Sequence, residues 1–217
     1  MPRASKASKI PKEIKKLDWK PGTLLNPVPA IMVSCGREGE KPNIITLAWA
    51  GTINSDPPMV SISIRKERHS HKIISETGAF VVNLVTQDLL WATDFCGVKS
   101  GKDVDKFAEM HLTAVPGDAV QAPYIHESPL NMECKVTQVI PLGTHDLFLA
   151  EVMATHVNAD LIDAAGALHL NSAKLVCYNH GLYQEVGKVL GYYGYSVRKK
   201  KVIEREKKSR RKKDIHK

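Results

Sequence analysis

The sequence predicts a β-rich α+β fold, a small closed antiparallel β-barrel with peripheral helices. Short apolar segments rich in β-branched residues follow one another, and turn residues separate them. A few helical patterns lie between these segments, but the repeated strand-helix-strand rhythm of a doubly wound parallel sheet is missing. No segment repeats at a fixed period, so we expect one barrel domain rather than a repeat array.

Three strands are predicted in the first third of the chain. Residues 30–35 form the first strand, and residues 43–50 form the second, which is rich in β-branched side chains and closes on Gly51. Residues 59–65 alternate strictly between polar side chains and the apolar side chains of Val60, Ile62 and Ile64. Because alternate side chains point to opposite faces of a strand, the polar face must meet water or a ligand.

Helices and further strands are predicted in the rest of the chain. A helix over 70–76 has Gly78 at its C-cap and leads into a strand over 79–85. Two more helices are expected over 88–95 and 104–110, and two long strands over 130–140 and 146–156.

Positive charge is concentrated at the two ends of the chain. The net charge is +5 for residues 1–20, −6 for residues 21–197 and +9 for residues 198–217. We therefore expect a basic N-terminal segment (1–20), an acidic folded domain (21–197) and a basic C-terminal tail (198–217). The tail is interpreted either as a solvated helix or frayed end, or as a contact to a polyanion, although it lacks the interleaved aromatic residues that stack on bases.

Several classes of protein are excluded by what the sequence lacks. No apolar run is long enough to span a bilayer, and the four cysteines are 38 to 61 residues apart, so we expect a cytoplasmic protein with reduced thiols. The segment Gly97 to Lys102 has the wrong spacing for a phosphate loop, and Gly187, Gly191 and Gly194 do not form a dinucleotide fingerprint. Cys96 has no accompanying Cys/His spacing that would support a nucleophile.

A candidate anion site follows the alternating strand, over residues 65–72. Guanidinium groups, a hydroxyl and free helix N–H groups would meet there at the positive end of a helix dipole. The alternative is an exposed basic turn with Ser70 as an ordinary N-cap. His69 and His71 could also be metal ligands, but no third ligand has a recognisable spacing. Polar residues within apolar strands also require partners, namely Thr46, Trp49, Asn83 and the nearby His145.

Seven segments of this chain, in order, resemble the flavin reductase-like proteins with an FMN-binding split barrel, most closely the flavoredoxin branch. The segments are 26–30, 43–49, 65–71, 78–84, 94–107, 128–135 and 143–152. The resemblance implies a split barrel that forms a homodimer and binds one FMN per subunit without a covalent link. It covers about residues 20–195 and leaves the basic tail outside.

The resemblance also implies a set of cofactor-binding residues. Arg68, His69 and Ser70 would hold the phosphate, and Asn43, Thr46, Ala48 and Trp49 would line the isoalloxazine. Lys106, His145 and Tyr178 match positions near the ring, where a lysine would favour the anionic reduced flavin. Asn83, Cys96 and Ser100 match positions around the same pocket. Ala150 stands where the family pattern has glycine, and we expect its methyl group to narrow the space over the ring.

The sequence therefore favours an FMN-dependent oxidoreductase, with catalytic roles assigned to no residue and His145 and Lys106 as candidates that tune the flavin. Two forms of this activity remain open: an NAD(P)H-dependent flavin or ferric reductase, and a flavoredoxin-like carrier that exchanges electrons with a redox protein. The alternative from another class is a basic-tailed protein that binds nucleic acid or an anionic surface without redox chemistry.

Overall fold

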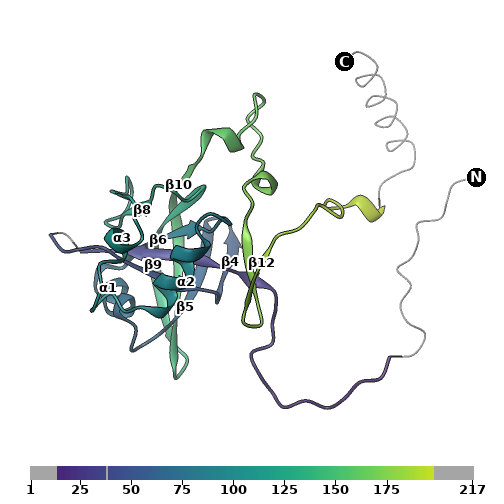
Figure 1. Cartoon of the computed structure of the whole chain (residues 1–217), viewed down its shortest axis with the longest axis horizontal. Coiled ribbons are helices and arrows are strands. Elements are labelled where there is room, and N and C mark those ends of the chain that lie inside the picture. The colour runs from purple at the N-terminus through teal and green to yellow at the C-terminus, as the bar shows by residue number, and fades with distance from the viewer. Residues whose placement is uncertain (1–13, 38, 198–217) are drawn as a thin grey trace, which may run out of the picture.

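A computed structural model describes residues 14–37 and 39–197 of the chain, and its body is built on a seven-stranded antiparallel sheet (Figure 1). The strand order is β3-β2-β6-β9-β10-β5-β4. These strands are β2 (Ile31–Cys35), β3 (Asn43–Leu47), β4 (Ala50–Ser55), β5 (Pro58–Arg65), β6 (Ala79–Leu84), β9 (Leu130–Pro141) and β10 (His145–Val157). Two irregularities in the register of β9 and β10 bend the longest pair.

The sheet curls because its two edge strands are consecutive in the chain. β3 and β4 lie at opposite ends of the strand order, yet only Ala48 and Trp49 connect them, which spans at most about 11 Å. Within the described residues, no ladder of hydrogen bonds joins β3 to β4. The β-rich α+β class is confirmed, whereas closure of the predicted barrel is not shown.

The apolar core has two parts, which β2 separates. Ile31, Val33 and Cys35 face one cluster with Ile62 and Phe148, inside the curled sheet. Met32, between them, faces a second cluster, where residues of the helices pack on the outside. Every residue of β2 is buried because both faces of the strand are covered.

Three helices and two small sheets surround the curled sheet. The helices are α1 (His69–Thr77), α2 (Leu90–Val98) and α3 (Lys106–Glu109). One small sheet joins β1 (Val28–Pro29), β11 (Val176–Asn179) and β12 (Leu182–Glu185), and the other pairs β7 (Ala114–Val115) with β8 (Tyr124–Ile125). Short 3-10 turns occur at Ala159–Leu161, Leu170–Ser172 and Tyr195–Val197.

The predicted elements differ from these bounds in two informative places. The strand predicted over 43–50 ends at Leu47, where the chain turns a corner between the two edges of the sheet and continues as β4. The helix predicted over 104–110 begins later, because Asp105 is its N-cap and accepts a hydrogen bond from the Ala108 N–H at 3.1 Å. The predicted C-cap Gly78 is confirmed: it adopts a left-handed conformation, with φ of 66°.

The chain ends that carry most of the positive charge are largely outside the described residues. The predicted tail 198–217 lies there entirely, together with residues 1–13 of the predicted N-terminal segment. No helix in the described part of the chain has both the length and the apolar character needed to cross a membrane. All four cysteines are free, and Cys35, Cys96 and Cys134 are buried.

Candidate functional site

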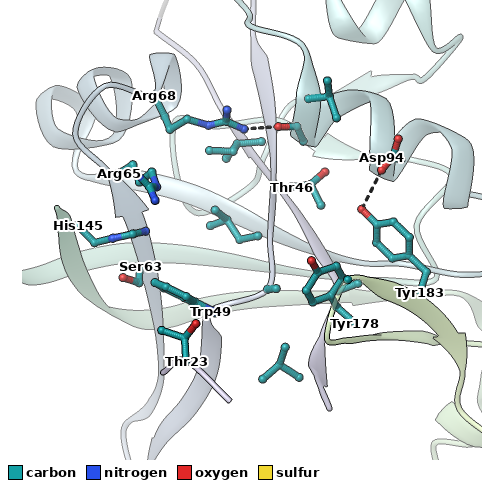
Figure 2. Close-up of a pocket in the computed structure, with 18 of the residues that line it drawn as sticks. Thr23, Thr46, Trp49, Ser63, Arg65, Arg68, Asp94, His145, Tyr178 and Tyr183 are labelled. Atoms are coloured by element: carbon teal, nitrogen blue, oxygen red, sulfur yellow. Dashed lines mark hydrogen bonds between the residues drawn. The ribbon is translucent and has the colours of Figure 1, made fainter. Parts of the chain in front are cut away.

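A cavity of about 950 Å³ lies where the corner between β3 and β4 meets helices α1 and α2 and the β11-β12 hairpin (Figure 2). This volume is at the upper end of the range for small-molecule and cofactor sites. Six of the residues predicted to bind the cofactor line it: Thr46, Ala48, Trp49, Arg68, His145 and Tyr178.

One wall of the cavity combines an aromatic and a basic surface. The rings of Trp49 and His145 lie with their centroids 4.8 Å apart, and His145 pairs with Arg65 across strands β10 and β5. The Ser63 N–H donates to the Trp49 carbonyl at 2.9 Å, which fixes the corner that carries the indole. The polar face predicted for residues 59–65 therefore faces the cavity through Ser63 and Arg65.

Two tyrosines of the β11-β12 hairpin form another wall. Tyr178 and Tyr183 make an edge-to-face contact with centroids 5.6 Å apart, and the Tyr183 hydroxyl donates to Asp94 of α2 at 3.3 Å. Burial, together with Asp94, raises the pKa of Tyr183 to about 12, so its hydroxyl stays protonated at neutral pH.

The sequence reasoning found Tyr178 but missed the hairpin and Tyr183. His180 and Gly181 form its two-residue turn, and both have positive φ values, 48° and 91°. Such turns favour Gly at the second position, so the Asn179-His-Gly181 segment between two short strand patterns was the available signal.

A smaller pocket of about 160 Å³ adjoins the large cavity and shares Ile45, Glu67 and Arg68 with it. It lies at the N-terminus of α1, where the first N–H groups of a helix lack acceptors within the helix and carry the positive end of its dipole. The other residues that line it are Asn43, His69, Ser70, Lys99, Ser100, Gly101 and Lys106. Asn43 and Lys106 thus line the smaller pocket rather than the large cavity near the aromatic walls.

Ser70 is part of the pocket floor and does not cap the helix. Arg68 occupies the N-cap position, and Ser70 is buried within the first turn, where its Oγ accepts a hydrogen bond from Asn43 Nδ2 at 2.8 Å. The alternative interpretation of Ser70 as an ordinary N-cap was therefore wrong. A Cβ at Gly101 would lie 2.1 Å from Asn43 Oδ1, so only glycine lets the loop pass this close to the floor.

The smaller pocket is rich in positive charge. The Lys106 ammonium is buried, and burial lowers its pKa to about 8. Burial and the nearby cations Lys102, Arg37 and Lys106 lower the pKa of His69. Arg68 donates to the carbonyl of Gly97 at the end of α2, which holds its guanidinium between the two pockets. This arrangement suits an anion.

Two of the predicted site residues line neither pocket. Asn83 is fully buried, its Nδ2 donates to the Met32 carbonyl and its Oδ1 accepts from the Ile125 N–H, so its amide crosslinks the core. Cys96 packs in the second core cluster, beneath the helices, where burial raises the pKa of its thiol to about 11. The methyl group of Ala150 likewise packs in the core inside the curled sheet, so the expectation that it narrows the ring site was wrong.

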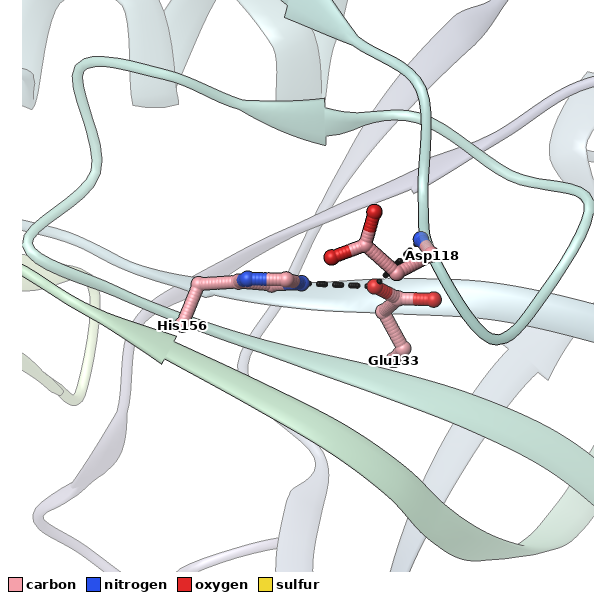
Figure 3. Close-up of side chains that lie close together, drawn as sticks. All are labelled: Asp118, Glu133 and His156. Carbon is pink, nitrogen blue, oxygen red and sulfur yellow. Dashed lines mark hydrogen bonds and ion pairs between the residues drawn. The ribbon is translucent and has the colours of Figure 1, made fainter.

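A second group of polar side chains, Asp118, Glu133 and His156, has ligand atoms within 4.8 Å of one another (Figure 3). The carboxylate of Glu133 has no exposed surface, and its oxygens accept hydrogen bonds from His156 Nε2 at 2.6 Å and from three backbone N–H groups at 2.7 to 2.9 Å. These donors occupy the lone pairs that a metal would need. Glu133 therefore anchors the loop over 118–120 to strand β9 of the sheet.

Comparison with known proteins places this geometry in a family. Residues 24–186 match the family described as flavin reductase like domain. The flavoredoxin of Desulfovibrio vulgaris (Miyazaki F) is 31% identical with a TM-score of 0.79, and that of Methanosarcina acetivorans is 26% identical with a TM-score of 0.78. Each likeness covers 85% of this chain and 100% of the other.

An uncharacterized protein of Archaeoglobus fulgidus is 35% identical over 121 residues, which are 55% of this chain and 68% of that protein. The overall fold is thus shared with the two flavoredoxin structures. Because the family match spans well over half of the sequence, the protein belongs to the flavin reductase-like family.

Proposed function

We propose that this chain is a flavoprotein oxidoreductase that binds FMN without a covalent link, with the ring in the large cavity and the phosphate in the smaller pocket. The observation that carries the proposal is that a cationic pocket at a helix N-terminus is continuous, through Arg68, with a larger cavity that has aromatic walls. The flavoredoxin structures similar to this chain support the choice of a flavin.

The residues of the smaller pocket fit a terminal phosphate. Gly101 leaves room that a Cβ would fill, and a Cβ at Gly97 would lie 3.2 Å from the Cβ of Thr46 on the floor of the large cavity. A pocket of about 160 Å³ suits a phosphate monoester and has little room for the adenylate that continues from the phosphate in FAD. We therefore favour FMN over FAD.

When bound, FMN supplies the transfer of electrons between a reduced donor and an acceptor. The protein's own residues hold and orient it. Arg68 and the first turn of α1 bind the phosphate, while Trp49 and Tyr178 enclose the ring. Thr144 Oγ1 lies 2.9 Å from His145 Nδ1, which orients the imidazole and leaves its Nε2 for a ligand. Because Lys106 lines the smaller pocket, we assign it to the phosphate rather than to the ring.

The electron donor is proposed to be NAD(P)H or a redox protein. The exposed Trp49 indole, with 45% of its surface accessible, leaves the cavity open to a partner. Steady-state oxidation of NADH and NADPH, measured with FMN, ferric chelates and thioredoxin-like proteins, distinguishes a reductase from a carrier. The four free cysteines agree with the cytoplasmic location that belongs to this proposal.

Purified protein stripped of flavin is expected to bind about one FMN per chain and to bind riboflavin at least about tenfold more weakly, since riboflavin lacks the charged phosphate. Quenching of flavin fluorescence during titration with FMN, riboflavin and FAD measures the three affinities. Equal affinity for FMN and riboflavin would contradict the phosphate site, and tighter binding of FAD would contradict the choice of cofactor.

The protein is also expected to be a homodimer. Large apolar side chains are exposed on the N-terminal and C-terminal segments, which extend from the same side of the body (Figure 1); among them are Trp19, Leu25, Leu190 and Tyr193. A surface of this kind is typical of an interface. Light scattering should give twice the chain mass of 24.0 kDa; a monomer that still holds flavin at micromolar concentration would count against the dimer.

The basic tail could bring the protein to a polyanion, and this contact stays a prediction because residues 198–217 lie outside the described residues. Nucleic-acid binding without redox chemistry is the alternative function. A colourless preparation that gains no flavin on titration would favour that alternative.

A further inference from the structure

Lys106 is a buried cation without a buried anion. Its side chain belongs to a residue that is 3% exposed, and its Nζ donates to the carbonyls of Ile44 at 2.6 Å and Cys96 at 2.8 Å. Among the described residues, no carboxylate forms an ion pair with it, and none contributes to the shift of its pKa. Two carbonyl dipoles leave one N–H donor and most of the charge uncompensated.

A buried ammonium group rarely lacks an opposing charge, because burying an unpaired charge costs free energy. Lys106 lines the smaller pocket together with Arg68, His69 and Lys99. Glu67 also lines it, but its carboxylate is exposed and pairs with Arg65 at 3.4 Å rather than with Lys106. The negative charge that would balance Lys106 therefore has one place to lie, inside that pocket. The first turn of α1 and the hydroxyl of Ser70 border the same space.

We propose that Lys106 is the buried counter-charge of the bound phosphate, and that it couples the binding of a phosphate dianion to the gain of a proton at alkaline pH. This inference rests on the proposed function, since FMN is the phosphate that we assign to the pocket. It gives Lys106 a positioning role at the phosphate, and it makes the exchange of cofactor depend on pH.

The thiols and the imidazole around Lys106 do not titrate near pH 8. Burial raises the pKa of Cys96 on α2 to about 11 and that of Cys35 on β2 to about 12, so both thiols stay neutral. The pKa of His69 is lowered, so His69 is neutral in this range. The exposed amines of Lys99 and Lys102 belong to the adjoining loop.

The sign of the effect follows from linkage. Without ligand, burial lowers the pKa of Lys106 to about 8, and an opposing dianion raises it. Above pH 8 the free protein must therefore take up a proton to bind FMN. The affinity for FMN falls roughly tenfold for each pH unit above the free pKa until the bound pKa is reached, and the affinity for riboflavin does not.

Calorimetric titration of the full chain with FMN, in two buffers of different ionisation enthalpy, tests this directly. At pH 8 to 8.5 we expect uptake of about half a proton or more per FMN, and none with riboflavin, which shares the ring but lacks the phosphate. Inorganic phosphate serves as a second probe. No uptake with FMN, or equal uptake with riboflavin, would overturn the proposal.

Variants assign the proton to one side chain. Lys106→Met should bind FMN about tenfold more weakly at pH 7, and a plot of its FMN affinity against pH should show no break near pH 8. Lys102→Met, the control on the same loop, should keep this break. If Lys106→Met does not fold, Lys106→Arg keeps the charge without titrating in this range and should abolish the break. Persistence of the break in either Lys106 variant would refute the assignment.

The experiment also separates this proposal from the proposed function. Binding of inorganic phosphate with uptake of a proton, by a protein that binds no flavin, would support the role of Lys106 and refute the cofactor. Binding of FMN without proton uptake would do the reverse.

Discussion

Glu133→Ala is expected to lower the free energy of unfolding by about 3 to 5 kcal/mol, the cost of removing one partner from a buried charged network. The carboxylate has no exposed surface, and its loss leaves the N–H groups of Asp118, Ala119 and Val120 without their acceptor. His156 would also lose its partner, although its ring still stacks on Tyr124. The three N–H groups lie on a part-buried loop, and each donor left without an acceptor there costs free energy.

Urea denaturation of wild type and variant measures this loss. Glu185→Ala on β12 is the matched control, because Glu185 is exposed, and its replacement should change the stability by no more than about 0.5 kcal/mol. Glu133→Gln tests the charge itself, since an amide keeps one acceptor and roughly the same shape. A loss below about 1 kcal/mol for Glu133→Ala would show that the 118–120 loop does not depend on this carboxylate.

The stability of wild type relative to Glu133→Gln is expected to depend on pH with a defined sign. Burial alone would raise the pKa of Glu133, but the hydrogen bonds from His156 and the three N–H groups hold it below its usual value. A lowered pKa in the folded state gives stability that is present above the unfolded pKa, near 4.3, and is lost as pH falls through the folded value. The difference in the free energy of unfolding between wild type and Glu133→Gln should therefore shrink below about pH 4.

The elements that the sequence predicted well are those whose pattern is local. Residues 59–65 alternate with period two, and Val60, Ile62 and Ile64 are all buried as that pattern requires. The β11-β12 hairpin carries mostly half-exposed residues, so its alternation is weak, and its existence depends on pairing with β1 about 150 residues earlier. A tertiary contact of this kind leaves no mark on the strand pattern itself, so the turn at His180 and Gly181 was the local signal that remained.

For the predicted site residues, too, the local pattern was informative and the tertiary partners could not be predicted. A polar residue within an apolar strand must have a partner, but the sequence does not say whether that partner is a ligand or the protein. Asn83 finds its partners at Ile125 and Asn131, more than 40 residues away, and so it is structural. Lys106 was expected beside the ring, yet its ammonium reaches the carbonyls of Ile44 and Cys96 and lines the smaller pocket.

Arg68→Ala is expected to weaken the binding of FMN by about 1.5 to 3 kcal/mol, or about 10- to 150-fold, the scale of a hydrogen bond to a charged group. Arg68 lines both pockets and precedes the first turn of α1, so its guanidinium can reach a phosphate that lies between ring and helix. Arg68→Lys keeps the charge but loses the planar fork that binds two phosphate oxygens, and it should fall between wild type and alanine.

The readout that decides the role of Arg68 is the comparison of FMN with riboflavin. Lys72→Ala is the matched control, because Lys72 is an exposed cation on the same helix that lines neither pocket and pairs with Glu76 at 3.8 Å. If Arg68 binds the phosphate, its replacement weakens FMN and leaves riboflavin nearly unchanged. An equal loss for both flavins would mean that Arg68 acts through its hydrogen bond to the Gly97 carbonyl, by holding the end of α2 in place under the ring. The phosphate would then have to lie elsewhere.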